Sequence, residues 1–237
     1  MHDRTKTNPM KTARVLLSLG ALALSAPALT SCNIVTPVAY VIEGPGQIEA
    51  EFTLADKKTV VFVDDPRNIL PRSALLTAIG DGVSFDLMER EILSSTVSTA
   101  QAISVARSMS GGDARNLASI EKIGRALDCA QVIHIQPFIF DLYGRSDSQG
   151  LRPTISVRVK VLDLDAKARV FPAAESQPEG REVMATIRET SLGGAMSRSN
   201  IIAVEDRLVQ RAALEVSRLF YKHDRVDLGE NLGTRRR

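Results

Sequence analysis

The sequence predicts an α/β domain with a mixed sheet of about four to five strands, covered by two or three helices. Short β-branched runs alternate with longer segments in which apolar residues recur every three or four positions. The resulting order, β-α-β-α-β-β-β-α, is typical of helices packed on a sheet. We find no internal repeat and no low-complexity tract in the chain.

The predicted domain opens with a strand and a long helix. Residues 59–65 (TVVFVDD) are mostly β-branched and end in two acids, which is typical of a buried strand that stops at a turn. Apolar residues recur at helical spacing over 71–94, so this segment is predicted to be a helix with one apolar stripe. Gly80 and Gly82 weaken its middle, each by about 1 kcal/mol relative to alanine.

The middle of the chain carries a weaker pattern. Residues 102–109 (AISVARSM) are predicted to form a second, weak strand. A short helix is predicted to follow Ser119, whose side chain can cap it. Cys129 comes after this helix, and we expect a small buried core residue there, because no base that would activate the thiol lies nearby in the sequence.

The second half of the domain contains three further strands and a last helix. Residues 131–144 are apolar on both faces and predict a central strand, with a bulge or bend at Pro137, which cannot donate to a ladder. Residues 154–165 alternate apolar and polar side chains, so we expect a strand with one solvated face that pairs antiparallel with its predecessor. An edge strand is predicted for 181–189 and a helix for 201–222.

The amino-terminal segment has the three parts of an export signal. Lys11 and Arg14 precede an apolar stretch (VLLSLGALALSAPAL), and small residues follow it. The apolar stretch has about fifteen residues, fewer than the roughly 20 that a membrane-spanning helix needs. An alternative start is Met10, since the positive region is complete from there.

The end of this signal carries a more specific motif. Leu29-Thr30-Ser31-Cys32 resembles the lipobox of bacterial lipoproteins, in which an apolar residue and two small residues precede a cysteine. The resemblance implies that a peptidase cuts between Ser31 and Cys32, that the Cys32 thiol carries a diacylglyceryl group, and that the new amino terminus is acylated, for example with palmitate. Several acyl chains would hold the mature protein on a lipid bilayer. The alternative is an ordinary signal peptide that is cut near a cysteine.

These motifs divide the chain into four segments. Residues 1–31 are predicted to be a signal peptide, 32–58 a lipidated tether and approach segment, 59–222 a single α/β domain, and 223–237 a polar tail. We expect the protein to face the periplasm or the cell exterior. Asn33 is not the aspartate that resembles the inner-membrane retention signal of enteric bacteria, which favours the outer membrane.

The composition argues against nucleic-acid binding. The formal net charge is +2, but residues 1–31 supply four basic residues and one acidic residue, so the remaining chain is close to neutral. Bulk charge therefore predicts no nucleic-acid partner.

The segment from about 58 to 165 resembles small α/β domains of bacterial envelope proteins. The resemblance rests on VVFVDD, a long helix, and IEKIGRALDCAQVIHIQPFIFDL, in which a short helix and a small-residue turn precede a buried strand. Similar domains occur in the amino-terminal part of TolB, in the curli secretion lipoprotein CsgG and in lipoprotein activators of penicillin-binding proteins. The resemblance implies a domain that binds protein partners and performs no chemistry, and it identifies no functional residue.

Asp64 and Asp65 are the candidate ligand-binding residues. Ligands of open α/β sheets bind beyond the carboxyl ends of strands, and two acids there can contribute to a cation site. The favoured alternative is an ordinary turn at Asp65 and Pro66, because further metal ligands cannot be named. His134 is expected to be a hydrogen-bonded structural residue, since the chain has neither a zinc ligand set nor a GxSxG motif. We therefore predict no metal, no cofactor and no catalytic residue.

Together these features predict a non-enzymatic, membrane-anchored envelope lipoprotein whose domain docks a protein partner in envelope assembly, transport or wall synthesis. Two alternatives stay open. A receptor for a small molecule or a metal ion would use Asp64 and Asp65 at the end of the first strand. A hydrolase would assemble its site from residues far apart in the sequence, around His134.

Overall fold

The computed structural model describes residues 46–110, 119–144, 146–147, 150–188 and 197–225. The chain divides into two units, and the larger one is Ile48–His223. The smaller unit includes Gln47 and Asp224, which belong to the two-residue strands β1 (Gln47–Ile48) and β10 (His223–Asp224). The sheet, the helices and the sites that follow all lie within Ile48–His223.

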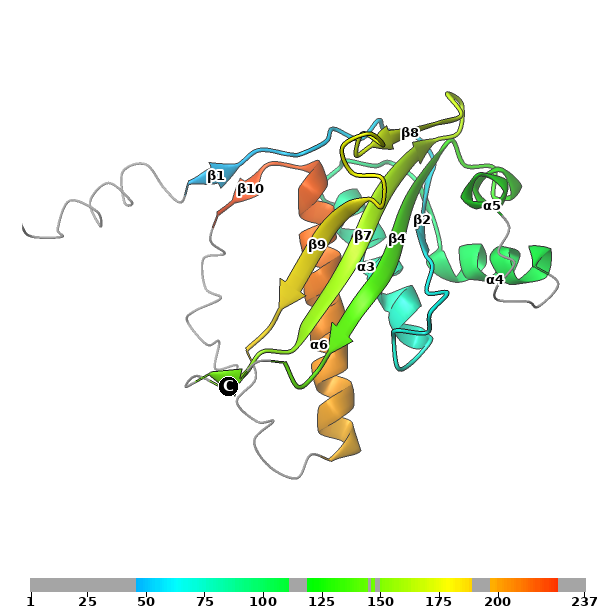
Figure 1. Cartoon of the computed structure of the whole chain (residues 1–237). Helices are drawn as coiled ribbons and strands as arrows, with labels where there is room; N and C mark the ends of the chain where they lie inside the picture. Colours follow the sequence, from blue (N-terminus) through cyan, green and yellow to red (C-terminus); the bar gives the residue numbers. More distant parts are fainter. Residues whose placement is uncertain (1–45, 111–118, 145, 148–149, 189–196, 226–237) are drawn as a thin grey trace, which may run out of the picture. The chain divides into compact units, whose positions relative to one another are not determined.

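The larger unit is built on a six-stranded sheet with the order β3-β2-β4-β7-β8, in which β9 also pairs with β7 (Figure 1). Its strands are β2 (Thr59–Val63), β3 (Thr96–Val97), β4 (Gln131–Asp141), β7 (Thr154–Asp163), β8 (Ala168–Phe171) and β9 (Arg181–Thr186). The pairs of β2 with β3 and with β4 are parallel, and the remaining pairs are antiparallel. Two short strands, β5 (Ser146–Asp147) and β6 (Gly150–Leu151), pair with each other. The predicted α/β class with a mixed sheet is confirmed.

Helices lie on both faces of this sheet. On one face pack α3 (Ala74–Glu89) and α6 (Arg198–Ser217), which continues into the 3-10 turn η3 (Arg218–Phe220). On the other face lie α4 (Thr99–Met109) and α5 (Ile120–Ala126), beside β2 and β4 (Figure 1). Among the described residues, we find no helix with the length and apolarity that crossing a membrane requires.

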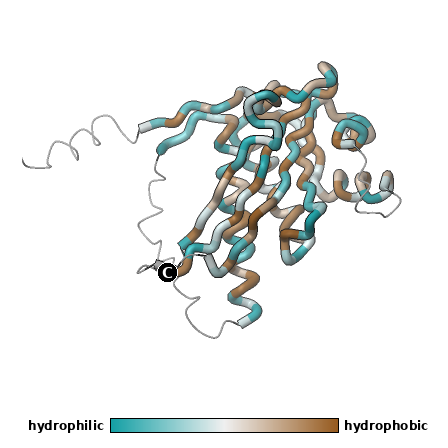
Figure 2. The backbone as a smooth tube through the Cα atoms, viewed as in Figure 1, coloured by the Kyte–Doolittle hydropathy of each residue, from teal (hydrophilic) through white to brown (hydrophobic). Residues whose placement is uncertain are grey.

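Strand β2 contributes to two separate cores. Val61 and Val63 belong to the large apolar cluster under α3 and α6, whereas Val60 and Phe62 belong to a smaller cluster under α4 and α5. Figure 2 shows hydrophobic stretches along the strands at the centre of the sheet. All five residues of β2 are buried, because the strand is covered on both faces.

Cys129 is buried in the smaller cluster as a free thiol, as expected from its place between a helix and a strand. Burial raises the pKa of the Cys129 thiol above its usual range. The thiol therefore stays protonated at neutral pH and is a packing residue in this structure.

The two longest strands, β4 and β7, form the antiparallel pair that the sequence predicts. Their register shifts between Pro137 and Ile139, so the predicted bulge is confirmed. Beyond the shift Ile139 lies opposite Ser156, and Phe140 lies opposite Ile155. The bulge therefore places an apolar side chain beside Ser156 on the face of the sheet that α3 and α6 do not cover.

Two strands share the outer edge of β7. Strand β9 pairs with the residues from Thr154 to Val159, and β8 pairs with those from Val161 to Asp163. Between β8 and β9 the chain turns back at Gly180, whose φ of 113° is rare for other residues. A Cβ atom there would also lie 3.0 Å from the Val159 carbonyl oxygen, so this close turn depends on glycine.

The prediction of a strand at 102–109 is wrong. These residues form most of α4, and the strand that follows α3 is the two-residue β3. Ser98 caps α4 by accepting a hydrogen bond from the Ala100 N–H. Ala102 and Ala106, four positions apart, are the residues that α4 buries in the smaller cluster, so its helical stripe is made of alanines and gives only a weak pattern.

Candidate functional site

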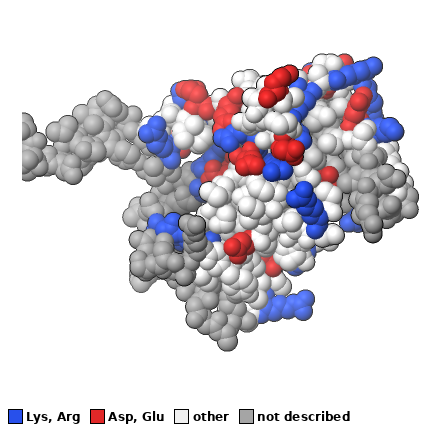
Figure 3. Space-filling view, in the orientation of Figure 1, with Lys and Arg blue, Asp and Glu red and all other residues white. Residues whose placement is uncertain are grey.

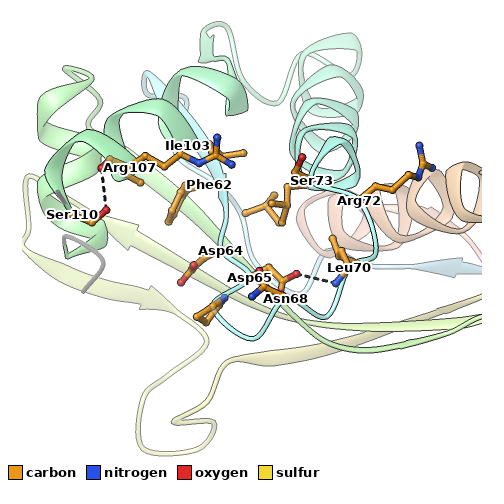
Figure 4. A pocket seen from close by; sticks show the side chains of 14 residues that line it. Phe62, Asp64, Asp65, Asn68, Leu70, Arg72, Ser73, Ile103, Arg107 and Ser110 are labelled. Atoms are coloured by element: carbon orange, nitrogen blue, oxygen red, sulfur yellow. Dashed lines mark hydrogen bonds between the residues drawn. The ribbon is translucent and has the colours of Figure 1, made fainter. Parts of the chain in front are cut away.

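The carboxyl end of β2 lies at a switch point of the sheet. After β2 the chain enters α3 on one face, and after the neighbouring parallel strand β3 it enters α4 on the opposite face. Connections that leave in opposite directions create a crevice beyond the strand ends, where open α/β sheets bind ligands. A pocket of about 330 Å³ occupies this crevice (Figure 4).

The pocket combines apolar walls with several polar groups. Its size is at the lower end of the roughly 300–1,000 Å³ typical of ligand pockets. Its apolar lining comes from β2, the turn after it, α3 and α4, and includes Phe62, Leu70, Leu76, Ile103 and Ala106. Its polar lining includes Asp64, Asp65, Asn68, Arg72, Ser73, Arg107 and Ser110. Both acids singled out in the sequence therefore line one cavity.

Asp65 organises the turn that follows β2. Its Oδ1 accepts the Ile69 N–H at 2.8 Å, and its Oδ2 accepts the Leu70 N–H at 2.9 Å. Asn68, within this turn, has a φ of 51°, a left-handed conformation that asparagine tolerates well. The Asp65 carboxylate is therefore engaged with the backbone of the pocket wall.

The carboxylate of Asp64, in contrast, accepts no hydrogen bond from a described residue. Its backbone N–H donates to the Ile135 carbonyl oxygen at 2.9 Å, which fixes Asp64 at the end of the β2–β4 ladder. Its Oδ2 lies 3.7 Å from Nε2 of His134, which is beyond hydrogen-bond range. Asp64 is thus an acid at the pocket whose carboxylate oxygens accept no hydrogen bond from the described part of the chain.

His134 lies behind Asp64 in the smaller core. The residue is only 5% exposed, and its ring stacks on Phe62 with the ring centres 6.0 Å apart. Neither ring nitrogen hydrogen-bonds to any residue that the structure describes. The hydrogen-bonded role predicted for His134 is therefore wrong within this part of the chain.

Two arginines line the pocket, and they differ in what they bind. Nε of Arg72 lies 2.6 Å from Oε2 of Glu205, and its Nη2 lies 2.6 Å from Oδ1 of Asp206, so two neighbouring acids of α6 hold it. The Arg107 guanidinium forms no ion pair with a described residue. Figure 4 shows Arg107 and Ser73 on the side of the cavity opposite Asp64 and Asp65.

The described residues do not assemble a metal site or a catalytic triad here. Within the described ranges, no group of three or more His, Cys, Asp and Glu side chains is placed to hold a metal ion. A Ser-His-Asp arrangement needs a hydroxyl group hydrogen-bonded to the imidazole. No hydroxyl group of the described residues makes that bond with His134.

A second candidate site is the part of the sheet that α4 and α5 leave uncovered. We call it the open face and define it by six residues on β4, β7 and β9: Phe138, Ile139, Ser156, Arg158, Lys160 and Met184. Ile139 and Met184 lie on either side of Ser156 in the register of the three strands. Ile139, on the interior strand β4, is 45% exposed, and Met184, on the edge strand β9, is 69% exposed.

Charged groups gather at one end of the open face. Figure 3 shows a broad uncharged surface over β4, β7 and β9, with acidic and basic side chains collected beyond it toward the upper end of the view. Arg158 packs over the Phe138 ring at 4.5 Å from its centre and also pairs with Glu179 and Glu182. Burial, and next the nearby Arg169, lower the pKa of Lys160, so this cation gains little compensation from neighbouring acids.

Some of the site residues predicted from the sequence lie together in the structure, and others lie outside its described residues. Asp64 and Asp65 both line the switch-point pocket, but binding at either residue stays a prediction. Ser31 and Cys32 lie outside the described residues. Sequence reasoning missed Arg107, because 102–109 was read as a strand, and it missed the open face, because the position of α4 and α5 over the sheet is not encoded in any one strand.

The comparisons with known proteins identify no family. No family model and no curated protein matches this sequence. Among solved structures, the chain is similar to the PelC dodecamer from Paraburkholderia phytofirmans, with 13% identity and a TM-score of 0.37 over 74% of this chain and 96% of that one. It is also similar to lipoprotein GNA1162 from Neisseria meningitidis, with 14% identity and a TM-score of 0.36 over 65% and 96% of the two chains.

A third similar structure is the LpoB C-terminal domain from Salmonella enterica. The identity is 9% and the TM-score is 0.32 over 65% of this chain and 94% of that one. Because these values are low, we infer the function from the residues of this chain.

Proposed function

We propose that this protein is a non-catalytic, lipid-anchored protein of the bacterial envelope whose α/β unit docks a protein partner on the open face. The observation that carries the proposal is the exposed pair Ile139 and Met184 beside Ser156 on three adjacent strands. Apolar side chains on the face of a sheet are usually covered, and exposed apolar patches commonly mark interaction sites. The lipobox at Leu29–Cys32 supports an anchor at the membrane.

The chemistry of the open face indicates what kind of partner would fit. Ile139 and Met184 would be the apolar centre of the interface, and methionine adapts well to the shape of a partner. Lys160 stands at the charged end without an ion pair to a described residue. Burial first, and the neighbouring cations Arg169 and Arg158 next, lower its pKa. A partner surface with an apolar centre and an acidic edge would match this pattern of side chains.

A comparison of two matched substitutions tests this proposal. Met184→Asp places a charge in the apolar centre of the open face. Phe85→Asp places the same charge on α3, where Phe85 is 68% exposed and lies on the other side of the sheet. Each variant would be isolated from detergent-solubilised membranes after cross-linking, and co-purifying proteins would be quantified by mass spectrometry.

We expect Met184→Asp to reduce recovery of a specific protein about tenfold, the loss expected when a central apolar contact is removed. Phe85→Asp should leave recovery unchanged. Lys160→Glu alone should also lower recovery relative to wild type, because the new carboxylate would repel the acidic edge of the partner. Equal recovery with Met184→Asp and with wild type, or isolation of the wild-type protein alone, would contradict the proposal.

A further inference from the structure

The switch-point pocket has an anionic group, the Asp64 carboxylate, at one side. Asp65 is engaged by the Ile69 and Leu70 N–H groups, but the Asp64 carboxylate accepts no hydrogen bond from a described residue. The buried His134 ring lies 3.7 Å away and forms no hydrogen bond with it. Asp64 can therefore accept hydrogen bonds from a cationic group that enters the pocket.

The opposite side of the same pocket carries a cationic group, Arg107, that forms no ion pair with a described residue. Arg107, on the last turns of α4, reaches the space beside the start of α3 and also lines the shallow groove that continues between α3 and α4. Ser73 precedes α3 as its N-cap residue, and its hydroxyl makes no capping hydrogen bond. A guanidinium, a hydroxyl and the positive end of a 16-residue helix together favour an anion there.

The material between the two sides is apolar. Phe62 lies between the Asp64 side and the Arg107 side of the cavity (Figure 4), and Leu76 and Ile103 also line it. Arg72 does not compete for the anion, because Glu205 and Asp206 already hold its guanidinium. A ligand that uses the whole pocket therefore needs a cationic end, an anionic end and an apolar body.

We infer that this pocket binds a small zwitterion, either a free amino acid with an apolar side chain or a short apolar peptide. The ammonium group lies against Asp64, the carboxylate lies against Arg107 and Ser73, and the apolar part packs on Phe62, Leu76 and Ile103. This site lies on a different part of the unit from the open face, so it is independent of the proposed docking function.

Calorimetric titration of the full-length protein in detergent tests this inference with four probes. L-Leucine and L-leucyl-L-leucine carry both charges and differ in length. N-acetyl-L-leucine lacks the ammonium group, and L-leucinamide lacks the carboxylate. We expect saturable binding of at least one zwitterion and about tenfold weaker binding of each capped analogue, since a charge-assisted hydrogen bond is lost. The preferred length distinguishes an amino acid from a peptide.

Substitutions in the protein must match the changes in the ligand. Asp64→Asn should weaken binding of the zwitterion but leave binding of N-acetyl-L-leucine, which has no ammonium group, unchanged. Arg107→Gln should weaken binding of the zwitterion but leave binding of L-leucinamide, which has no carboxylate, unchanged. Arg67→Gln, in the exposed part of the same turn, and Glu89→Gln, at the end of α3, are matched controls that should keep full affinity. Circular dichroism verifies that each variant is folded.

Three results would overturn the inference. The first is the absence of saturable binding for both zwitterions. The second is equal binding of the capped and uncapped probes. The third is full affinity in Arg107→Gln and Asp64→Asn, which would place the bound molecule elsewhere.

Discussion

His134 and Asp64 approach each other without forming a hydrogen bond: Nε2 of His134 lies 3.7 Å from Oδ2 of Asp64. The imidazole is buried against Phe62, and neither of its nitrogens has a hydrogen-bond partner among the described residues. A buried polar group without a partner lowers stability by about 1–3 kcal/mol. The pair therefore identifies a position at which an apolar side chain would suit the fold better.

Replacement of this imidazole should not destabilise the protein. We expect His134→Leu to leave the free energy of unfolding unchanged or to raise it by about 1 kcal/mol, because an unsatisfied polar group is removed. Urea unfolding measures the difference. The control is Gln131→Leu on the same strand, which removes the hydrogen bond from Gln131 Nε2 to Thr59 Oγ1 and should lower stability by about 1 kcal/mol. A clear loss of stability in His134→Leu would mean that the imidazole has a partner after all.

The stability of the protein should fall much more when Arg72 alone is removed from its ion pair with Glu205 than when both residues are replaced. The Glu205 side chain is only 6% exposed, so Arg72→Met leaves a buried carboxylate without its cation. We expect a loss of about 3–5 kcal/mol in the free energy of unfolding. The double variant with Glu205→Met should recover most of it, because the buried charge is gone.

Lys58→Met provides the comparison for this pair. Lys58 pairs with Asp128, whose side chain is 98% exposed, so its removal should cost about 0–1 kcal/mol. Equal losses in Lys58→Met and Arg72→Met would argue against the buried character of the Arg72 pair.

Asp163 should contribute to stability in a pH-dependent way. Its Oδ1 accepts the Ala166 N–H at 3.0 Å and its Oδ2 accepts a hydrogen bond from Lys57 at 2.9 Å. The Ala166 N–H first, and Lys57 next, lower the pKa of the Asp163 carboxyl in the folded protein. Its contribution is therefore present above the unfolded-state pKa of about 3.9 and is lost as pH falls through the lower folded-state pKa.

Asp163→Asn tests this dependence. The stability gap between wild type and this variant should be constant above about pH 5 and should shrink toward acidic pH. Urea unfolding at a series of pH values measures the gap. Asp165→Asn, at a side chain that is 68% exposed, should give a smaller gap. A gap that does not change with pH would contradict the assigned role of Asp163.

The lipid anchor can be measured directly at Cys32. We expect protein extracted from membranes to begin at Cys32 and to carry added acyl mass, because the Leu29–Cys32 motif resembles a lipobox. Intact mass spectrometry beside a Cys32→Ala variant measures both features. A wild-type mass without lipid, or one that retains residues 10–31, would remove the anchor from the proposed function.

The strands of the fold could be predicted where one segment carries the whole signal. The β-branched run of β2 and the alternation in β7 report burial directly, and Pro137 indicates the bulge because it lacks an N–H group. The residues of α4 give a weak helical pattern, and the sequence wrongly predicts a strand there, because the buried stripe of the helix consists of alanines. Strand β8 was missed because only Phe171 among its four residues is buried.

Gly80 has a packing role that cannot be recognised from the sequence alone. Within α3 it lowers helix propensity, and from sequence alone it reads as a weakness. In the structure, an added Cβ would lie 2.2 Å from Oγ1 of Thr99 at the start of α4. Thr99 in turn donates to the Val61 carbonyl oxygen at 3.1 Å, so glycine is the residue that lets α3 and α4 approach beside β2.

In the candidate sites, too, residues next to a recognisable strand end can be predicted from the sequence, whereas residues brought in by distant elements cannot. Asp64 and Asp65 were found because a strand end is visible in the sequence. Arg107 reaches the same pocket only because α4 crosses the opposite face of the sheet, about forty residues later in the chain. The open face likewise depends on strands that are distant in sequence, and on helices that stop short of them.

The shared outer edge of β7 has a consequence for how the unit opens in solution. Because β9 ends its pairing at Val159 and β8 begins its pairing at Val161, the ladder on that edge is made of two independent lengths. Native-state hydrogen exchange should therefore divide at Lys160: the amides paired with the four-residue β8 should exchange at a lower opening free energy than those paired with β9. One continuous strand would then belong to two cooperative units, and transient release of β8 would bare the end of β7 without disturbing the surface around Met184.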